Sequence, residues 1–306
     1  MIFRALFEEK SALFERVLTM EYCVWEPLGE SKAVVQILHG MAEYIDRYER
    51  AAFALNNQGY AVAGHDHRGH GQKAEKLGYF AKKNGWDAVI KDAHAVTLEL
   101  KKRFPGKKLI LLGHSMGSFA AREYAIRYGN ELDGLVLSGT GFYPLPLAAA
   151  GKMAALLSPK EKPAKLVDKL AFSGNNKPFQ PARTPCDWLS RDEKEVDLYI
   201  DDPLCGFLFT GQAYSDFFGG LMKLTKKGRL SAMPKELPVY FMSGENDPVG
   251  QMGAGVKKVA EQFRKAGMKD VTVRLYPKAR HELFNELNRD EVTKELAEWL
   301  DSHIIK

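Results

Sequence analysis

Short apolar runs alternate with longer amphipathic stretches along most of the sequence, and this alternation restricts the possible folds more than any other feature. Lys108–Gly113 is an apolar run of strand length, and Met116–Tyr128, directly after it, carries aromatic and small residues at helical spacing. A parallel pair of strands needs a crossover connection, which is usually a helix. The sequence therefore predicts an α/β protein in which helices cover a mostly parallel sheet.

The same patterns predict the other elements of this sheet and its helices. Further strands are expected at Ala33–Leu38, Tyr60–Gly64, Leu132–Ser138, Leu237–Met242 and Val271–Tyr276, with an early antiparallel strand at Val17–Trp25. Helices are expected at Arg47–Asn57, Trp86–Arg103, Met252–Ala266 and Arg289–His303.

The alternation stops between Gly141 and about Leu230, where prolines and short helical pieces replace it. Loops longer than about 15 residues are uncommon, so we expect an inserted cap here rather than a loop. We assign the cap to residues 142–229 and the main domain to residues 1–141 and 230–306.

Composition excludes several classes of protein. The chain has 306 residues, 45% hydrophobic and 27% charged, which is typical of a globular protein that needs no disulfide or metal to fold. Its three cysteines, Cys23, Cys186 and Cys205, are scattered without metal-ligand spacing. No apolar run reaches about 18 residues, and charged residues interrupt the N-terminal stretch, so we expect neither a membrane span nor a signal peptide. These features predict a cytoplasmic protein.

The charge balance is only mildly basic, with 44 basic and 39 acidic residues and a net charge of +5. A nucleic-acid-binding protein would gather basic residues on one face or element, so no nucleic-acid partner is expected. Most of the excess lies in residues 151–185, where the acids are only Glu161 and Asp168. We interpret this stretch first as a solvated surface, and second as one that attracts anions or touches a membrane.

The segment Gly113-His114-Ser115-Met116-Gly117 matches the pattern G-x-S-x-G. The pattern alone is weak, but it lies where the clearest strand meets the following helix, as a nucleophile elbow requires. Side chains at positions 113 and 117 would collide with the neighbouring strand and helix, and Ser115 must adopt a strained backbone conformation. We therefore expect Ser115 to be a nucleophile and the Met116 N–H, at a helix N-terminus, to bind an oxyanion.

A serine nucleophile needs a base, usually a histidine that a carboxylate orients. Only His281 and His303 follow the elbow, and His303 lies at the end of the last predicted helix. His281 and Asp247 each lie in a loop just after a predicted strand, from which they can reach the carboxyl edge of the sheet. The sequence thus predicts a triad of Ser115, His281 and Asp247, with Glu245 as the competing acid.

The loop His39-Gly40-Met41 follows another predicted strand and offers the second oxyanion donor. Gly40 lets the backbone pass close to the serine, so we assign the Met41 N–H to the oxyanion hole together with that of Met116. His39 and Glu43 are expected to organise this loop by hydrogen bonds rather than to react.

His65, Asp66, His67 and His70 form the most metal-like cluster of the sequence. A zinc site would need further ligands, and the other histidines have better explanations. Arg68 and two glycines in the same loop favour a packed, hydrogen-bonded turn, so no metal is expected.

Together these motifs resemble the α/β-hydrolase superfamily, in which the triad follows the chain order serine, acid, histidine. Within it, the sequence is similar to the monoacylglycerol lipase and lysophospholipase group, also called serine aminopeptidase-like hydrolases. The matching segments are His39-Gly40-Met41-Ala42-Glu43-Tyr44, Gly64-His65-Asp66-His67-Arg68-Gly69-His70-Gly71, Gly113-His114-Ser115-Met116-Gly117 and Gly244-Glu245-Asn246-Asp247-Pro248-Val249. Many relatives carry histidine where this chain has Tyr44, a departure that leaves the triad untouched.

The resemblance implies an α/β-hydrolase fold with about eight strands and a helical cap inserted after the sixth strand. It also implies hydrolysis of carboxylic esters with one acyl chain, through an acyl-enzyme and without a cofactor. Peptidase, thioesterase and acyltransferase chemistry on the same triad are alternatives, as is a non-catalytic binding protein on this scaffold. The expected partner is a small ester or lipid, with at most peripheral membrane contact through the cap; the oligomeric state is not predicted. Apolar cap residues should pack the cap and partly line an acyl pocket above Ser115.

Overall fold

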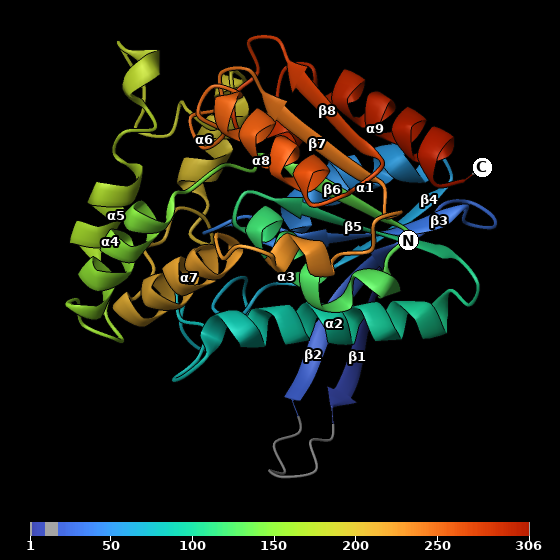
Figure 1. The fold of residues 1–306 in the computed structure, drawn as a ribbon, viewed down its shortest axis with the longest axis horizontal. Helices are drawn as coiled ribbons and strands as arrows, with labels where there is room; N and C mark the ends of the chain where they lie inside the picture. Colours follow the sequence, from blue (N-terminus) through green and yellow to red (C-terminus); the bar gives the residue numbers. More distant parts are fainter. Residues whose placement is uncertain (1, 10–17, 306) are drawn as a thin grey trace.

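The structure is a computed structural model that describes residues 2–9 and 18–305. In these residues it contains one eight-stranded sheet in the order β1-β2-β4-β3-β5-β6-β7-β8 (Figure 1). The strands are β1 (Ile2–Glu9), β2 (Leu18–Trp25), β3 (Ala33–Leu38), β4 (Tyr60–Gly64), β5 (Lys108–His114), β6 (Gly134–Ser138), β7 (Val239–Gly244) and β8 (Val271–Tyr276). β2 is antiparallel to both β1 and β4, and all other pairs are parallel.

Helices cover both faces of the sheet because successive side chains of each buried strand point to opposite faces. In β5, Leu109 and Leu111 belong to one apolar cluster, whereas Ile110 and Leu112 belong to the other. The helices of the first face include α2 (Gly85–Arg103), α3 (Met116–Tyr128) and α8 (Ala254–Lys265), and those of the second are α1 (Glu49–Asn56) and α9 (Arg289–His303). The continuous apolar strands of the sequence are thus explained by a sheet buried on both sides.

Parallel pairing brings the functional loops together. β5 pairs with β3 from Lys108 opposite Ala33 to Gly113 opposite Leu38, so the two strands end side by side. β6, β7 and β8 extend the sheet in the same direction. The loops after β3, β5, β7 and β8 therefore meet at the carboxyl edge of the sheet, where open α/β sheets bind their ligands.

Residues 139–238 lie between β6 and β7 and contain helices but no strand. The α-helices are α4 (Leu145–Leu156), α5 (Lys165–Phe172), α6 (Glu193–Asp201) and α7 (Gly211–Leu224). α7 packs against α2 and α3, which cover one face of the sheet, and α4 packs on α7. The insertion therefore forms a second layer on one side of the molecule (Figure 1). No helix of the described residues is long and apolar enough to cross a membrane.

The predicted mostly parallel sheet with flanking helices is confirmed, and several boundaries agree to the residue, such as those of Met116–Tyr128 and Val271–Tyr276. The strand predicted at Leu237–Met242 begins two residues later, at Val239. β1 was not predicted, because the charged residues Arg4, Glu8 and Glu9 interrupt its apolar residues. The predicted first residue of β2, Val17, lies outside the described residues.

Candidate active site

Ser115 lies at the turn between β5 and α3, with φ 51° and ψ −119°. A positive φ at a residue other than glycine is strained and is held here by the tight turn. A Cβ at Gly113 would lie 2.3 Å from the carbonyl oxygen of Gly117, and one at Gly117 would lie 2.0 Å from the carbonyl oxygen of Leu38. The two glycines are therefore required by close backbone packing around the turn.

His281 and Asp247 form a buried pair, with exposed fractions of 2% and 0%. The Nδ1–H of His281 donates to both carboxylate oxygens of Asp247, each at 3.0 Å. Asp247 also accepts hydrogen bonds from the Val249 N–H at 2.8 Å and the Ser243 hydroxyl at 3.2 Å. Glu245, the competing acid in the sequence, is exposed.

The pair tunes the pKa of both members. Burial alone would raise the pKa of the Asp247 carboxyl, but the charge and hydrogen bond of His281 outweigh burial and lower it. Burial alone would lower the pKa of His281, but Asp247 outweighs burial and raises it. Asp247 is therefore a carboxylate at neutral pH and stabilises the imidazolium form of His281.

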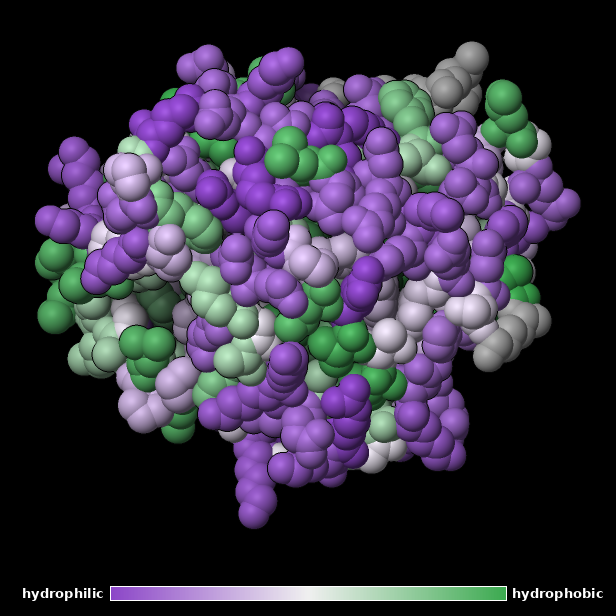
Figure 2. Space-filling view, turned by 90° about the horizontal axis from the view of Figure 1, so that it is seen from above, coloured by the Kyte–Doolittle hydropathy of each residue, from purple (hydrophilic) through white to green (hydrophobic). Residues whose placement is uncertain are grey.

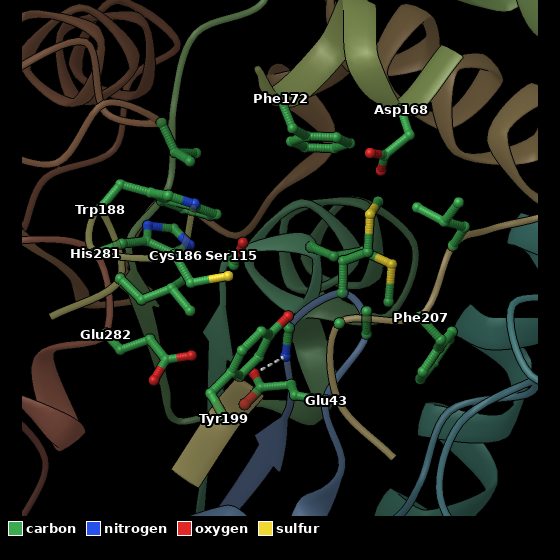
Figure 3. Close-up of a pocket in the computed structure, with 18 of the residues that line it drawn as sticks. Glu43, Ser115, Asp168, Phe172, Cys186, Trp188, Tyr199, Phe207, His281 and Glu282 are labelled. Atoms are coloured by element: carbon green, nitrogen blue, oxygen red, sulfur yellow. Dashed lines mark hydrogen bonds between the residues drawn. The ribbon is translucent and has the colours of Figure 1, made fainter. Parts of the chain in front are cut away.

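Ser115 and His281 both line a cavity of about 390 Å³ (Figure 3). Its apolar wall includes the insertion residues Phe172, Trp188, Leu189, Phe207 and Phe217. The Trp188 ring lies against that of His281, with centroids 5.0 Å apart. The volume is that of a small-molecule site, for which about 300–1,000 Å³ is usual.

Met41 and Met116 line the same cavity as Ser115. Met116 is the first residue of α3, so its N–H lies at the positive end of the helix dipole. Met41 lies in the loop after β3. This loop is held by Glu43, whose carboxylate accepts a hydrogen bond from the Gly40 N–H. A Cβ at Gly40 would lie 2.5 Å from that carboxylate, so a larger residue there would displace the Glu43 side chain from this hydrogen bond.

Arg47 forms a buried charge network that the sequence analysis did not predict. Its guanidinium donates to Glu43 at 2.7 Å and to Glu282, the residue after His281, at 2.8 Å. Burial alone would raise the pKa of Glu282, but Arg47 outweighs burial and lowers it. The arginine thus links the loop after β3 to the loop that carries His281. No motif in the sequence pairs Arg47 with Glu282, because the two are 235 positions apart in the chain.

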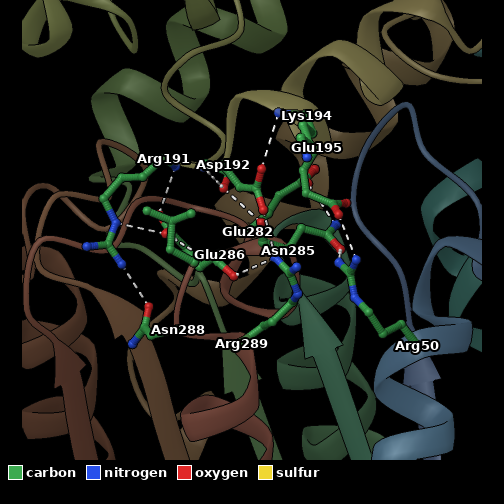
Figure 4. A network of polar contacts seen from close by, with 12 residues as sticks. Arg50, Arg191, Asp192, Lys194, Glu195, Glu282, Asn285, Glu286, Asn288 and Arg289 are labelled. Atoms are coloured by element: carbon green, nitrogen blue, oxygen red, sulfur yellow. Dashed lines mark hydrogen bonds and ion pairs between the residues drawn. The ribbon is translucent and has the colours of Figure 1, made fainter.

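The insertion is fastened to the histidine loop by a second polar network (Figure 4). The carbonyl of Leu189 accepts from the N–H of Glu282 at 2.7 Å. Arg191 donates to the buried carboxylate of Glu286 at 2.8 Å, and Arg289 donates to Asp192 at 2.8 Å. The segment that supplies Trp188 is therefore tied to the loop that positions His281.

Two of the buried histidines, His39 and His70, accept hydrogen bonds from backbone N–H groups in and around the loop after β3, whereas both ring nitrogens of His65 are buried without a hydrogen-bond partner among the described residues. The Nε2 of His39 accepts from the His67 N–H at 2.9 Å, and that of His70 accepts from the Ala42 N–H at 3.2 Å. Burial lowers the pKa of His65 and that of His70 to about 4, so both rings are neutral at pH 7. Within residues 2–9 and 18–305, no group of three His, Cys, Asp or Glu side chains is arranged to hold a metal ion.

A serine on a strained strand-to-helix turn, with a buried histidine–aspartate pair at the same sheet edge, defines the class of protein: an α/β-hydrolase. A solved carboxyl esterase from Bacillus coagulans, in complex with glycerol, has the same fold, with a TM-score of 0.88, 26% identity and 99% of each chain covered. Residues 29–288 match the model of the family described as serine aminopeptidase, S33, and the chain belongs to this family.

Curated relatives share most of the chain length. A monoacylglycerol lipase from Mycolicibacterium smegmatis is 29% identical over 92% of this chain and 93% of its own. The monoglyceride lipase of Mus musculus is 30% identical over 92% of this chain and 86% of its own. The predicted superfamily and group are confirmed, and the chain is a serine ester hydrolase.

Proposed function

We propose that the chain hydrolyses carboxylic esters with one acyl chain, such as monoacylglycerols, through a Ser115–His281–Asp247 triad. The buried His281–Asp247 pair, whose histidine lines the same cavity as Ser115, is the observation that carries this proposal. Asp247 holds the proton of His281 on Nδ1, which leaves Nε2 as the base that takes the Ser115 proton.

The reaction then proceeds in two steps. The Ser115 Oγ attacks the acyl carbonyl carbon, and the Met41 and Met116 N–H groups bind the oxyanion that forms. His281 gives its proton to the leaving alcohol, and an acyl-enzyme remains. A water molecule, deprotonated by His281, then attacks this ester and releases the acid and free Ser115.

The cavity wall supports an acyl-chain substrate, because aromatic side chains from residues 142–229 cover much of it. We propose that these residues form the cap and select the acyl chain. The names of the relatives from Mycolicibacterium smegmatis and Mus musculus support a monoacylglycerol in particular. Peptidase, thioesterase and acyltransferase activities stay alternatives on the same triad, and the cytoplasmic location stays a prediction from the sequence.

The outer surface of the cap supports contact with lipid. Figure 2 shows hydrophobic side chains gathered around a recess at its left edge, the side of α4 and α5. The exposed apolar residues of these helices and the turn after α4 are Leu145, Leu147, Met153, Leu156, Leu157, Leu166 and Leu170. We propose that this surface makes peripheral contact with an aggregated lipid substrate, as patches of this kind mark interaction sites.

A substrate panel tests the proposed function. Purified enzyme is assayed with p-nitrophenyl esters of two to sixteen carbons, a monoacylglycerol, a lysophospholipid and an aminoacyl amide. Each CH₂ buried in the cavity contributes about 0.8 kcal/mol, so kcat/KM should rise about tenfold for two added methylenes until the cavity is full. Activity should therefore peak at a short-to-medium chain. A flat profile, or preference for the amide over every ester, would contradict the acyl-pocket assignment.

A further inference from the structure

A second cavity, of about 590 Å³, lies beside the catalytic one. Phe119 and Tyr143 line both cavities and so form a shared wall. The second cavity is otherwise lined by the loop after β6 with the first residue of α4, the ends of α7 and α8, the segment 225–231 after α7, and Arg122 of α3. None of these other residues belongs to the proposed triad or oxyanion hole.

Arg122 is the unusual residue of this second cavity. Its side chain is only 4% exposed, and its Nε–H is buried without a hydrogen-bond partner. One terminal N–H group donates to the carbonyl of Gly141 at 3.2 Å. Within the described part of the chain no carboxylate pairs with the guanidinium, and burial lowers its pKa to about 10. Arg122 is therefore still charged at neutral pH, and a buried charge without a counter-ion is costly.

The surroundings of Arg122 favour an anion. The other charged residues that line the cavity are Lys226, Lys227 and Lys265, all exposed, and no aspartate or glutamate lines it. Lys265 forms an ion pair with Glu261 at 3.6 Å. The excess positive charge at the cavity therefore comes from Arg122, Lys226 and Lys227. Other arginines nearby behave differently: Arg127, on the same helix, pairs with Glu123 and Asp87.

Most of the remaining lining is apolar, with Phe142, Leu145, Leu221 and Leu224 beside the shared wall; the uncharged polar side chains that line the cavity are Thr225, Ser231 and Gln262 besides Tyr143. An apolar cavity with one buried cation matches a ligand with an apolar chain and a single negative charge. Because Lys226 and Lys227 are exposed to water, Arg122 is the buried cation beside this apolar lining, and a phosphate dianion would exceed its single charge and find no further buried donor cation.

We propose that this second cavity binds the anion of a medium-chain carboxylic acid, with the carboxylate on Arg122 and the chain against the apolar lining. Such an acid is the class of product that ester hydrolysis releases; this link rests on the proposed function, whereas the binding itself does not. Because the two cavities share Phe119 and Tyr143, a bound acid would contact the reverse side of the catalytic pocket wall.

The test measures binding without turnover. Octanoate, octanol and inorganic phosphate are titrated into the whole protein by calorimetry, with wild type compared to Arg122→Met. Methionine keeps an apolar chain of similar length, and Arg127→Met is the matched control on the same helix. Octanoate should bind wild type and the control, and bind Arg122→Met about tenfold to a hundredfold more weakly, since a charge-assisted hydrogen bond is lost. Octanol should bind wild type and Arg122→Met alike.

Two further readouts distinguish a ligand site from a structural arginine. Without ligand, Arg122→Met should have a higher melting temperature than wild type, because the substitution removes an unpaired buried charge. In the NMR spectrum of the wild-type protein, the Arg122 Nε–H resonance should shift with octanoate and not with octanol. This measurement uses wild type alone, so it decides the question even if Arg122→Met folds poorly. The proposal is overturned if octanoate binds Arg122→Met as tightly as wild type, if phosphate binds as tightly as octanoate, or if the resonance does not move. If the substrate panel failed to show esterase activity, the proposed function would fail, but the expected results of these binding measurements would not change.

Discussion

Replacing Asp247 by asparagine should lower kcat about 10⁴-fold while the fold persists. In the structure, the carboxylate accepts the His281 Nδ1–H on both oxygens at 3.0 Å and is fully buried. The amide of asparagine presents a donor group as well, which favours the tautomer with its proton on Nε2. That tautomer cannot take the Ser115 proton. The same change in a characterised triad costs about 10⁴, which corresponds to about 5.5 kcal/mol of transition-state stabilisation.

The pH profile of the same variant checks the electrostatic part of this reasoning. His281 must be neutral to act as a base, and Asp247 raises its pKa above the ordinary 6.5. Wild-type kcat/KM should therefore rise with pH through a midpoint above this value. In Asp247→Asn the carboxylate charge is gone and burial still lowers the pKa of the histidine, so the midpoint should move to lower pH.

The matched control is Glu245→Gln, because Glu245 lies two residues away but is exposed. Hydrolysis of a p-nitrophenyl ester, measured over a range of pH for both variants, should show a small effect for Glu245→Gln only. A large loss with Glu245→Gln and a small one with Asp247→Asn would refute the assignment of the acid.

Three further substitutions test other parts of the site. Ser115→Ala should lower kcat by about 10⁴–10⁶ and prevent labelling by a fluorophosphonate probe, while circular dichroism stays native; retention of more than a few per cent of activity would sink the mechanism. Arg47→Met leaves the carboxylates of Glu43 and Glu282 buried without their cation and should cost about 3–5 kcal/mol in urea unfolding, part of which Glu43→Gln in the same chain should restore. Gly117→Ala places a Cβ 2.0 Å from a backbone oxygen of β3, so both melting temperature and activity should fall, and an unchanged pair of values would show that the turn can relax.

The sheet and the serine turn could be predicted because their signals are local. β5 is buried on both faces and therefore reads as a continuous apolar run, and a glycine is needed on either side of Ser115 for steric reasons that any backbone of this shape imposes. Asp247 and His281 followed from their places after strands, since parallel strands bring their carboxyl ends together.

The charge partners of the site could not be predicted in the same way. Arg47 reaches Glu282 across 235 positions of the chain, and only the folded sheet brings the segment after β3 and the segment after β8 to the same edge. Trp188 lies in a stretch without periodic pattern, so no sequence signal places it on His281. The isolation of Arg122 is still less visible, because a missing partner is a property of the packed interior.

The position of the insertion gives these unpredicted contacts a common consequence. Trp188 packs on the ring of His281, and the backbone of Leu189 accepts a hydrogen bond from the next residue, Glu282. Trp188 and Leu189, which line the cavity, are thus joined to the loop that carries His281. The helices α4 and α5 instead expose apolar side chains on the outer surface. If the proposed contact of α4 and α5 with lipid moves these helices, we expect Trp188 and His281 to keep their mutual position, because the polar contacts of Arg191 and Arg289 hold this segment to the main domain. On this proposal, movement of the outer helices would change access to the cavity that Ser115 lines and would leave the geometry of the His281–Asp247 pair intact.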